Sequence, residues 1–343
     1  MSDRPFDLIV FGASSFVGQI LCDYLFERHG EGGDLKWAMA GRSKTKLESV
    51  RASLGEAASG IELITADAAD ENALREMCGQ SRVIISTVGP YALYGSELVK
   101  VCVETGTDYM DLAGEAQWIL RMLQAHESQA RTSGARIIHC CGFDSVPSDL
   151  GVYHHQKVAL EKFGEPATQI RMQVARMKGA ASGGTIASIV NIAREMAKNP
   201  SLRKTLANPY SLVPGGKARV RQPNIATPTR DPETGAWLGP FVMAGINTRI
   251  VHRSNALSGY DYGVDFLYDE SMRMGRGLKG GLAATTLTGG LGAFMAGAVL
   301  PPSRWLMEKY FLPKPGEGPS PEQQCEGMYD LRFYGTTAGG NKL

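Results

Sequence analysis

The first residues that could do chemistry lie in a turn of small side chains near the start of the chain. Residues 6–12 (FDLIVFG) predict a strand and residues 13–29 a helix, and the turn between them follows G-x-x-G-x-x-G with serine at the middle glycine. The first glycine permits a tight turn, and the small side chains let backbone N–H groups approach a pyrophosphate at the helix N-terminus. The alternative is an ordinary strand-to-helix turn. The predicted pyrophosphate-binding residues are Gly12, Ser14, Ser15, Phe16 and Val17.

The end of the second predicted strand indicates which dinucleotide would bind. A carboxylate at this position usually accepts the ribose 2′-hydroxyl of NAD(H). This chain instead has Ala40, Gly41, Arg42 and Ser43, with Lys46 one helical turn later. A guanidinium can bind a 2′-phosphate through two hydrogen bonds and stack on an adenine. The sequence therefore predicts NADP(H), with Arg42, Ser43 and Lys46 at the phosphate, unless these are ordinary solvated charges at a helix start.

Two further strand ends complete the predicted cofactor site. Asp67 follows the third strand, where it could meet the adenine amino group or cap the next helix. Thr87, Val88, Gly89 and Pro90 end the fourth strand. Ligands of doubly wound sheets bind at the carboxyl ends of the strands. We therefore expect the 87–90 turn to face the nicotinamide half.

The elements that must position these residues alternate between strand and helix. Six short apolar runs, each followed by a helical pattern, predict a parallel sheet covered by helices on both faces, which is a Rossmann-type, doubly wound α/β fold. The predicted strands are 6–12, 35–40, 61–66, 82–88, 108–112 and 136–142, and the helices are 13–29, 44–54, 70–79, 95–105, 116–133 and 147–163.

After residue 150 the alternation stops. The pattern predicts a strand over 168–177, a helix over 184–198, mostly loop over 199–240, a helix or strand beginning over 241–251, and strands over 258–269 and 326–335. The length of 343 residues suits two domains. We therefore expect an NADP-binding domain over 1–150, a mixed α/β substrate or dimerisation domain over 151–335, and a tail over 336–343.

Residues 278–300 form an apolar, glycine-rich segment with a single charge, Lys279. Its length just reaches that of a membrane span, but its glycines and threonines lower its hydrophobicity. We expect it to be buried or to line a hydrophobic substrate tunnel. Contact with a membrane surface and a true span are the alternatives.

Charge and cysteine content limit the partners. A net charge of +1 argues against nucleic-acid binding, which usually needs a basic surface. The six cysteines form no C-x-x-C pair and have no histidine cluster near them, so the sequence predicts no metal site. Their apolar surroundings favour a reducing compartment, and we expect a cytoplasmic protein, in part membrane-associated.

Several longer motifs are more specific than the glycine turn. The chain closely resembles the saccharopine dehydrogenase-like oxidoreductases, and within them the trans-acting enoyl reductases. The motifs that carry this resemblance are 86–95 (STVGPYALYG), 106–115 (GTDYMDLAGE), 141–149 (CGFDSVPSD), 182–185 (SGGT) and 312–320 (LPKPGEGPS).

The resemblance implies NADPH-dependent reduction of a carbon–carbon double bond on a lipid- or polyketide-like acyl chain, linked to a carrier protein or to coenzyme A. Other branches reduce the imine of saccharopine, but the second half of this chain has no clear arginine cluster for three substrate carboxylates. A dinucleotide-bound, lipid-associated protein without turnover is a further alternative, because fold alone does not give function. We also expect a homodimer, with peripheral membrane contact as a further interaction.

Hydride transfer to an enoyl thioester requires a donor for the thioester oxygen and an acid for the α-carbon. Tyr91, Tyr94 and Tyr109 are candidate donors near strand ends, and Asp144 and Ser145 could orient a substrate. Each has a structural alternative, because tyrosines beside a Gly-Pro turn often only pack and Asp144 could cap a helix. The predicted catalytic residues are Tyr91, Tyr109 and Asp144.

Overall fold

The computed structural model describes residues 4–180, 182–216, 220–314 and 316–343. The chain divides into two compact units. The first unit holds residues 1–142, 181–191 and 312–318, and the second holds residues 143–180, 192–311 and 319–343. The sequence predicted one crossing near residue 150. The structure places the first crossing at 142/143 and returns two later segments to the first unit, which no local pattern announces.

A six-stranded parallel sheet forms the centre of the first unit, in the order β3-β2-β1-β4-β5-β6. Its strands are β1 (Phe6–Phe11), β2 (Trp37–Gly41), β3 (Glu62–Thr65), β4 (Ser81–Ser86), β5 (Asp108–Asp111) and β6 (Ile137–Ile138). The order reverses between β1 and β4, where doubly wound sheets bind their ligands. The predicted fold class is confirmed.

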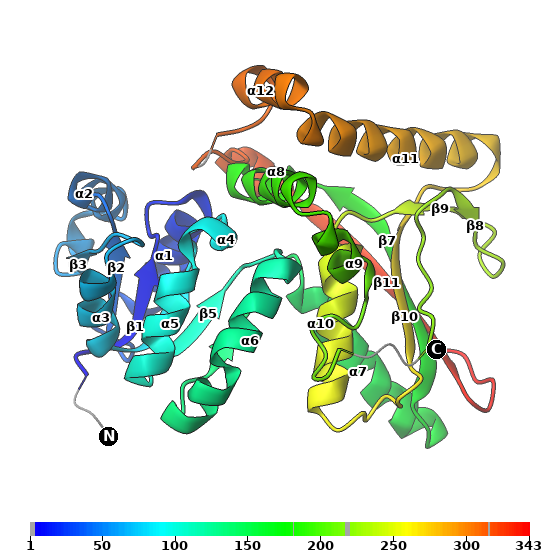
Figure 1. The fold of residues 1–343 in the computed structure, drawn as a ribbon, viewed down its shortest axis with the longest axis horizontal. Helices are drawn as coiled ribbons and strands as arrows, with labels where there is room; N and C mark the ends of the chain where they lie inside the picture. The colour runs from blue at the N-terminus through cyan, green and yellow to red at the C-terminus, as the bar shows by residue number, and fades with distance from the viewer. Residues whose placement is uncertain (1–3, 181, 217–219, 315) are drawn as a thin grey trace. The chain divides into compact units, whose positions relative to one another are not determined.

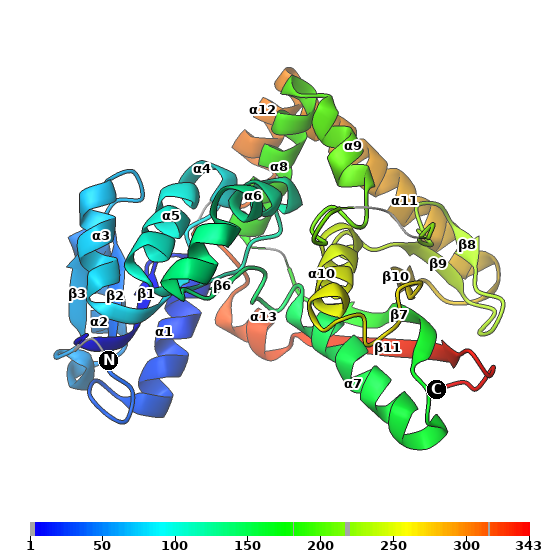
Figure 2. The same ribbon diagram turned by 60° about the horizontal axis from the view of Figure 1, so that its bottom comes forward.

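Helices cover both faces of this sheet. They are α1 (Phe16–His29), α2 (Lys44–Ser53), a short 3-10 turn η1 (Glu56–Ala58), α3 (Glu71–Gly79), α4 (Tyr91–Tyr94), α5 (Ser96–Thr105) and α6 (Ala116–Ser133). Helices α3, α5 and α6 pack side by side on one face, and α1 and α2 lie on the other (Figures 1 and 2). The central strands are buried from both faces, which explains why β1 and β2 are continuous apolar runs.

The second unit contains a five-stranded mixed sheet in the order β11-β7-β10-β9-β8. Only β7 and β10 pair in parallel. The strands are β7 (Ala167–Lys178), β8 (Thr229–Arg230), β9 (Trp237–Pro240), β10 (Leu267–Arg273) and β11 (Met328–Thr337).

Two helices, α7 (Val146–Phe163) and α10 (Ala244–Leu257), cover one face of this second sheet (Figures 1 and 2). Four more helices belong to the same unit: α9 (Ser201–Ala207), α11 (Gly277–Val299), α12 (Pro301–Tyr310) and α13 (Pro321–Cys325). Helix α8 (Gly183–Lys198) begins in the first unit and ends in the second.

Two predictions for the second half are wrong in detail, and one is confirmed. The strand predicted over 258–269 is instead a turn followed by β10, because Gly259, Tyr260 and Gly263 all adopt positive φ angles that a strand cannot contain. The described part of the 199–240 segment is mostly loop, as predicted, with the short elements α9, β8 and β9. Residues 336–343 are no loose tail, because the chain reverses after β11 and Gly335 and Leu343 exchange two backbone hydrogen bonds.

The apolar segment 278–300 differs most from its prediction. It forms α11, which is long and apolar enough to cross a membrane, yet only 11% of its most hydrophobic 18-residue window is buried. The helix packs along β9 on one side and leaves most of its surface exposed. The expectation of a buried segment is therefore wrong for the folded chain, and a role in lining a substrate tunnel stays a prediction.

Candidate dinucleotide site

Gly12 ends β1 in a conformation that favours glycine. Its φ angle is +93°, and a Cβ atom there would lie 2.7 Å from both the Thr87 Oγ1 and the Val88 Cγ2 atoms. The backbone of the turn thus passes directly against the end of β4. Such a position accepts no side chain, which is what a backbone approach to a pyrophosphate requires.

Ser15, which replaces the middle glycine of the motif, has two defined contacts. It is the N-cap of α1, and its Oγ accepts a hydrogen bond from the Gly18 N–H at 2.9 Å. The same Oγ lies 2.8 Å from the Thr87 Oγ1, which also donates to the Gly12 carbonyl at 2.9 Å. The serine therefore ties the predicted pyrophosphate turn to the end of β4.

The rest of the turn leaves backbone donors at the start of α1. The N–H groups of a first helical turn have no intrahelical acceptor, so they can bind an anion. Ser14, Phe16 and Val17 are half-buried here. A Cβ on Gly18 would meet the Gly12 carbonyl oxygen at 2.2 Å, so the helix packs closely on the turn. These features fit a dinucleotide pyrophosphate.

A segment far along the chain covers this turn, and sequence reasoning assigned it no role. Residues 312–318 belong to the first unit, and a Cβ on Gly318 would lie 2.5 Å from the Phe16 ring. The same segment holds the start of α8, because the Gly183 N–H donates to the Glu317 carbonyl at 2.9 Å. The only signal in the sequence was the presence of both segments among the family-like motifs.

The end of β2 fits a 2′-phosphate. Arg42 follows the strand and its side chain is exposed, as is that of Lys46. The Ser43 Oγ accepts a hydrogen bond from the Lys46 N–H at 3.4 Å and so caps α2. Two cations therefore lie beside a helix N-terminus, with no carboxylate in the 40–43 turn to repel a phosphate.

Asp67 is not the cap of the helix that follows it. Asp70 has that role, because its Oδ1 accepts hydrogen bonds from the Asn72 and Ala73 N–H groups. Asp67 is exposed, and its Oδ1 accepts from the Ala69 N–H at 2.9 Å, within its own turn. Of its two predicted roles, the adenine contact stays a prediction.

The 87–90 turn leads into α4, and the buried carboxylate of Glu115 fixes the start of that helix. The Glu115 Oε1 accepts from the Tyr91 N–H at 2.7 Å and the Oε2 from the Ala92 N–H at 3.1 Å. The Ser188 Oγ of α8 donates to the Glu115 Oε1 at 3.0 Å. Glu115 is fully buried. One carboxylate thus connects the start of α4 to α8, a role that the sequence did not reveal.

Two of the tyrosines predicted as catalytic are buried. The Tyr91 hydroxyl donates to the Ser86 carbonyl at 3.0 Å and accepts from the Leu112 N–H at 3.2 Å, and its ring stacks on Trp118. Burial raises the pKa of Tyr91 well above its ordinary value, and nearby Asp111 adds to the effect. Tyr109 is fully buried, and burial likewise raises its pKa. In this structure both side chains pack inside the first unit, and their catalytic roles stay predictions.

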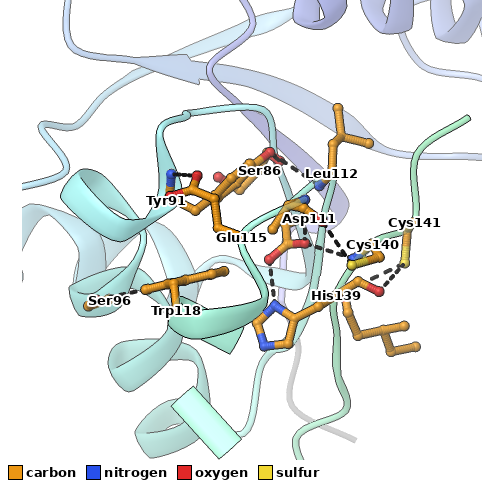
Figure 3. A network of polar contacts seen from close by, with 12 residues as sticks. Ser86, Tyr91, Ser96, Asp111, Leu112, Glu115, Trp118, His139, Cys140 and Cys141 are labelled. Carbon is orange, nitrogen blue, oxygen red and sulfur yellow. Dashed lines mark hydrogen bonds and ion pairs between the residues drawn. The ribbon is translucent and has the colours of Figure 1, made fainter. Parts of the chain in front are cut away.

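Figure 3 shows a second polar group at the ends of β5 and β6, in which Asp111 and His139 point toward one another. The His139 Nδ1 lies 2.6 Å from the Asp111 Oδ2, and the Asp111 Oδ1 accepts from the Ala113 and Cys140 N–H groups. The imidazole packs edge-on against Trp118, with ring centroids 5.0 Å apart. Both side chains are buried, and the pair joins the ends of β5 and β6.

The remaining predicted site residues are Tyr94, Asp144 and Ser145. Tyr94 ends α4 and is 46% exposed, so it is the accessible member of the three predicted tyrosine donors. Asp144 is exposed in the second unit, just before α7, whose N-cap is Ser145 rather than Asp144. Ser145 is buried, and its Oγ donates to the Asn247 Oδ1 at 2.9 Å. The role of Asp144 stays a prediction, and Ser145 is committed to the core of the second unit.

The second unit also buries a carboxyl group that sequence reasoning missed. Glu270 of β10 is 2% exposed and receives hydrogen bonds from the Tyr268 hydroxyl at 2.8 Å and the Asn247 amide at 3.0 Å. Burial raises the pKa of Glu270 to about 7, although these hydrogen bonds oppose the shift. The sequence DES within a strand gave the only signal.

Comparison with known proteins agrees with this geometry. A family model described as the saccharopine dehydrogenase NADP binding domain matches residues 8–138, which span β1 to β6. Among solved structures, a saccharopine dehydrogenase of Saccharomyces cerevisiae has a TM-score of 0.40 and 20% identity, covering 51% of this chain and 35% of its own.

Relatives that align with nearly the whole chain have higher sequence identity. A trans-acting enoyl reductase of Mycobacterium tuberculosis is 38% identical over 99% of this chain and 83% of its own, and one of Mycobacterium ulcerans is 36% identical with the same coverage. Identity at this level over both units shows the family. This chain belongs to the trans-acting enoyl reductases among the saccharopine dehydrogenase-like, NADP-binding oxidoreductases.

Proposed function

We propose that this protein reduces the carbon–carbon double bond of an enoyl thioester on a lipid- or polyketide-like acyl chain, with NADPH as the reductant. The observation that carries the proposal is similarity to enoyl reductases over 99% of the chain, which includes the whole second unit and not only the dinucleotide domain. Function depends on sites and not on the shared fold, so similarity beyond the Rossmann unit is what matters here.

The residues of the first unit have distinct roles in this proposal. The 12–18 turn and the start of α1 hold the pyrophosphate, and Arg42 with Lys46 holds the 2′-phosphate. The 87–90 turn borders the nicotinamide half. Glu115 fixes the residue that follows this turn, because its carboxylate accepts a hydrogen bond from the Tyr91 N–H. Bound NADPH supplies a hydride for the β-carbon of the substrate.

The thioester oxygen needs a hydrogen-bond donor and the α-carbon needs a proton. Tyr91 and Tyr109 are committed to the core, which leaves Tyr94 as the exposed tyrosine beside the 87–90 turn. Asp144 keeps its predicted part in orienting the substrate. Tyr94 is therefore the first residue to test as the donor, and Tyr94→Phe removes only its hydroxyl.

Two alternative functions would require different features of the protein. A saccharopine-type imine reductase needs cations for three substrate carboxylates, but prominent arginines of the second unit are already engaged. Arg171 pairs with Asp231 at 2.9 Å and with Glu233, and the Arg249 guanidinium donates to the Ser211 Oγ at 3.1 Å. A dinucleotide-bound, lipid-associated protein without turnover would bind NADPH and never oxidise it.

Stopped-flow oxidation of NADPH distinguishes these functions. We expect oxidation with enoyl thioesters carried on coenzyme A or on an acyl carrier protein, and none with the imine that is the precursor of saccharopine. Binding of NADPH without oxidation by enoyl thioesters of any chain length or carrier would contradict the proposal. Oxidation only with the imine would favour the saccharopine-type activity.

Two sequence-based expectations remain predictions. We infer a homodimer in the cytoplasm, which sedimentation equilibrium and cell fractionation would test directly. A monomer at micromolar concentration would contradict the first, and recovery outside the cytoplasmic and membrane fractions would contradict the second.

A further inference from the structure

Helices α11 and α12 form an apolar hairpin, residues 277–311, on the second unit (Figure 1). Many of its large apolar side chains are exposed rather than packed, which is unusual for so many in one segment. Leu278 is 94% exposed and Phe311 is 76% exposed. The exposed large side chains of the hairpin are Leu278, Leu282, Leu300, Trp305, Leu306, Tyr310 and Phe311.

The hairpin is held in place along one side. The Trp237 ring of β9 lies against Gly281, where a Cβ would come within 3.2 Å of it, and a Cβ on Gly239 would lie 3.0 Å from Leu287. These contacts fix the first half of α11 along the sheet. A helix attached in this way lies on the surface of its unit, and it could cross a membrane only by giving up these contacts.

Helix α12 is fixed against the end of α11. The Ser303 Oγ donates to the Gly297 carbonyl at 2.8 Å, and a Cβ on Gly297 would lie 2.9 Å from the Met307 sulfur. Arg194 of α8 pairs with Glu308. The hairpin is therefore formed before it meets any partner, so docking requires little ordering of the chain.

The charged side chains of the hairpin and its flank are almost all positive. No Asp or Glu occurs from residue 276 to residue 307, and the single acid, Glu308, is paired with Arg194. The cations are Arg276, Lys279, Arg304 and Lys309. Lys309 lies over the Trp305 ring, with its Nζ 4.8 Å from the centroid. Exposed leucines, a tryptophan and lysines together are typical of segments that lie at the boundary of an anionic membrane.

An open groove beside α11 adds to this surface. It has a volume of about 520 Å³, and its walls are mostly apolar, with Lys279 as the single charged residue among them. The lining residues are Met274, Lys279, Leu282, Ala283, Thr286 and Leu287. An acyl tail with an anionic headgroup matches both the apolar walls and the single cation.

We propose that the apolar hairpin docks on the surface of a bilayer that contains anionic phospholipid, with α11 lying in the plane of the interface. A second copy of the chain fits less well, because the exposed middle of α11 presents mainly glycine, alanine and threonine. The cores of stable interfaces are instead enriched in aromatic residues and methionine. The proposal goes beyond the reductase function and does not depend on it.

Flotation of the full chain with lipid vesicles tests the proposal. We expect co-flotation with vesicles of phosphatidylcholine and phosphatidylglycerol, weaker co-flotation with phosphatidylcholine alone, and release by high salt. The fluorescence of exposed Trp305 should shift to the blue on binding, and Trp305→Phe should abolish that shift. Absence of co-flotation with the anionic vesicles would overturn the proposal.

Matched variants locate the surface. Leu278→Ser with Leu282→Ser should lower the vesicle affinity about tenfold or more, because two exposed leucines no longer enter the lipid. The control is Leu160→Ser with Leu257→Ser, which removes two exposed leucines elsewhere in the same unit and should leave binding unchanged. Lys279→Gln with Lys309→Gln should remove the preference for anionic lipid.

Two results would contradict the assignment. Equal losses in the hairpin and control variants would show that the surface is not specific. A lipid-free dimer that dissociates in the hairpin variant, without vesicle binding by the wild type, would make this surface an interface between copies. If the double variant fails to fold, Leu278→Ser alone serves, because its side chain is almost fully exposed.

Discussion

Replacing Gly12 by alanine should weaken dinucleotide binding and also lower the stability of the fold. The new Cβ would lie 2.7 Å from the Thr87 Oγ1 and the Val88 Cγ2, well inside van der Waals contact, at a φ of +93°. The positive φ alone costs about 1–2 kcal/mol for an L-residue. Displacing the end of β4 adds about 1–3 kcal/mol. Because these atoms form the pyrophosphate turn and its neighbour, we expect the affinity for NADPH to fall at least tenfold.

Gly134→Ala is the matched control for this experiment. Gly134 has a φ of +81° in the same unit, but a Cβ there meets nothing within 4 Å. It therefore carries the backbone cost without the clash. Urea unfolding measures stability in both variants, and isothermal titration calorimetry measures NADPH binding. Unchanged NADPH affinity in folded Gly12→Ala, or an equal loss in Gly134→Ala, would refute this account of the turn.

Three further substitutions test other parts of the structure. Arg42→Ala should weaken NADPH binding by about 1.5–3 kcal/mol and leave NADH binding nearly unchanged in a fluorescence titration; equal losses for the two cofactors would exclude a 2′-phosphate contact. Glu115→Gln should lower the free energy of unfolding by about 1–3 kcal/mol, measured in urea, because an uncharged amide replaces a buried carboxylate with three donors. Glu270→Gln should flatten the pH dependence of stability. The pKa of Glu270 is about 7 in the folded state, against an ordinary value of 4.5. The protonated side chain therefore stabilises the fold fully below pH 4.5, and the free energy of unfolding of the wild type falls by about 3 kcal/mol as the pH rises from 4.5 through 7. An identical pH profile for both proteins would show that Glu270 does not titrate in this range.

Local patterns predicted the first unit well because its function and its fold use the same local rules. The turn after β1, the end of β2 and the alternation of strands and helices are all contained in short windows of sequence. The central strands β1 and β2 are largely buried on both faces, so each is a mostly apolar run that a window detects. The sheet order then follows from the short right-handed connections of such folds.

Burial by residues distant in the sequence leaves no local pattern. Tyr91 and Tyr109 lie near strand ends, where a donor could stand, but only their packing in the structure shows that they are buried. Glu115 accepts hydrogen bonds from α4 and from α8, which a short window cannot show. The strand predicted over 258–269 is wrong for a different and local reason, because positive φ angles at Gly259 and Gly263 override an alternating pattern.

The serine at the middle position of the glycine motif follows from the same geometry. A glycine there would remove one link between the turn and the end of β4, because the Ser15 Oγ joins the Gly18 N–H to the Thr87 Oγ1. The hydrogen bond from the Thr87 Oγ1 to the Gly12 carbonyl would stay. Thr87 begins the turn that leads to α4, and Glu115 fixes that helix to α8. A continuous line of hydrogen-bonded groups and short backbone segments therefore runs from the pyrophosphate turn to α8, entirely within the first unit. Since each member fixes the next, the two halves of the predicted dinucleotide site are held in one geometry, which would lower the ordering cost of binding NADPH.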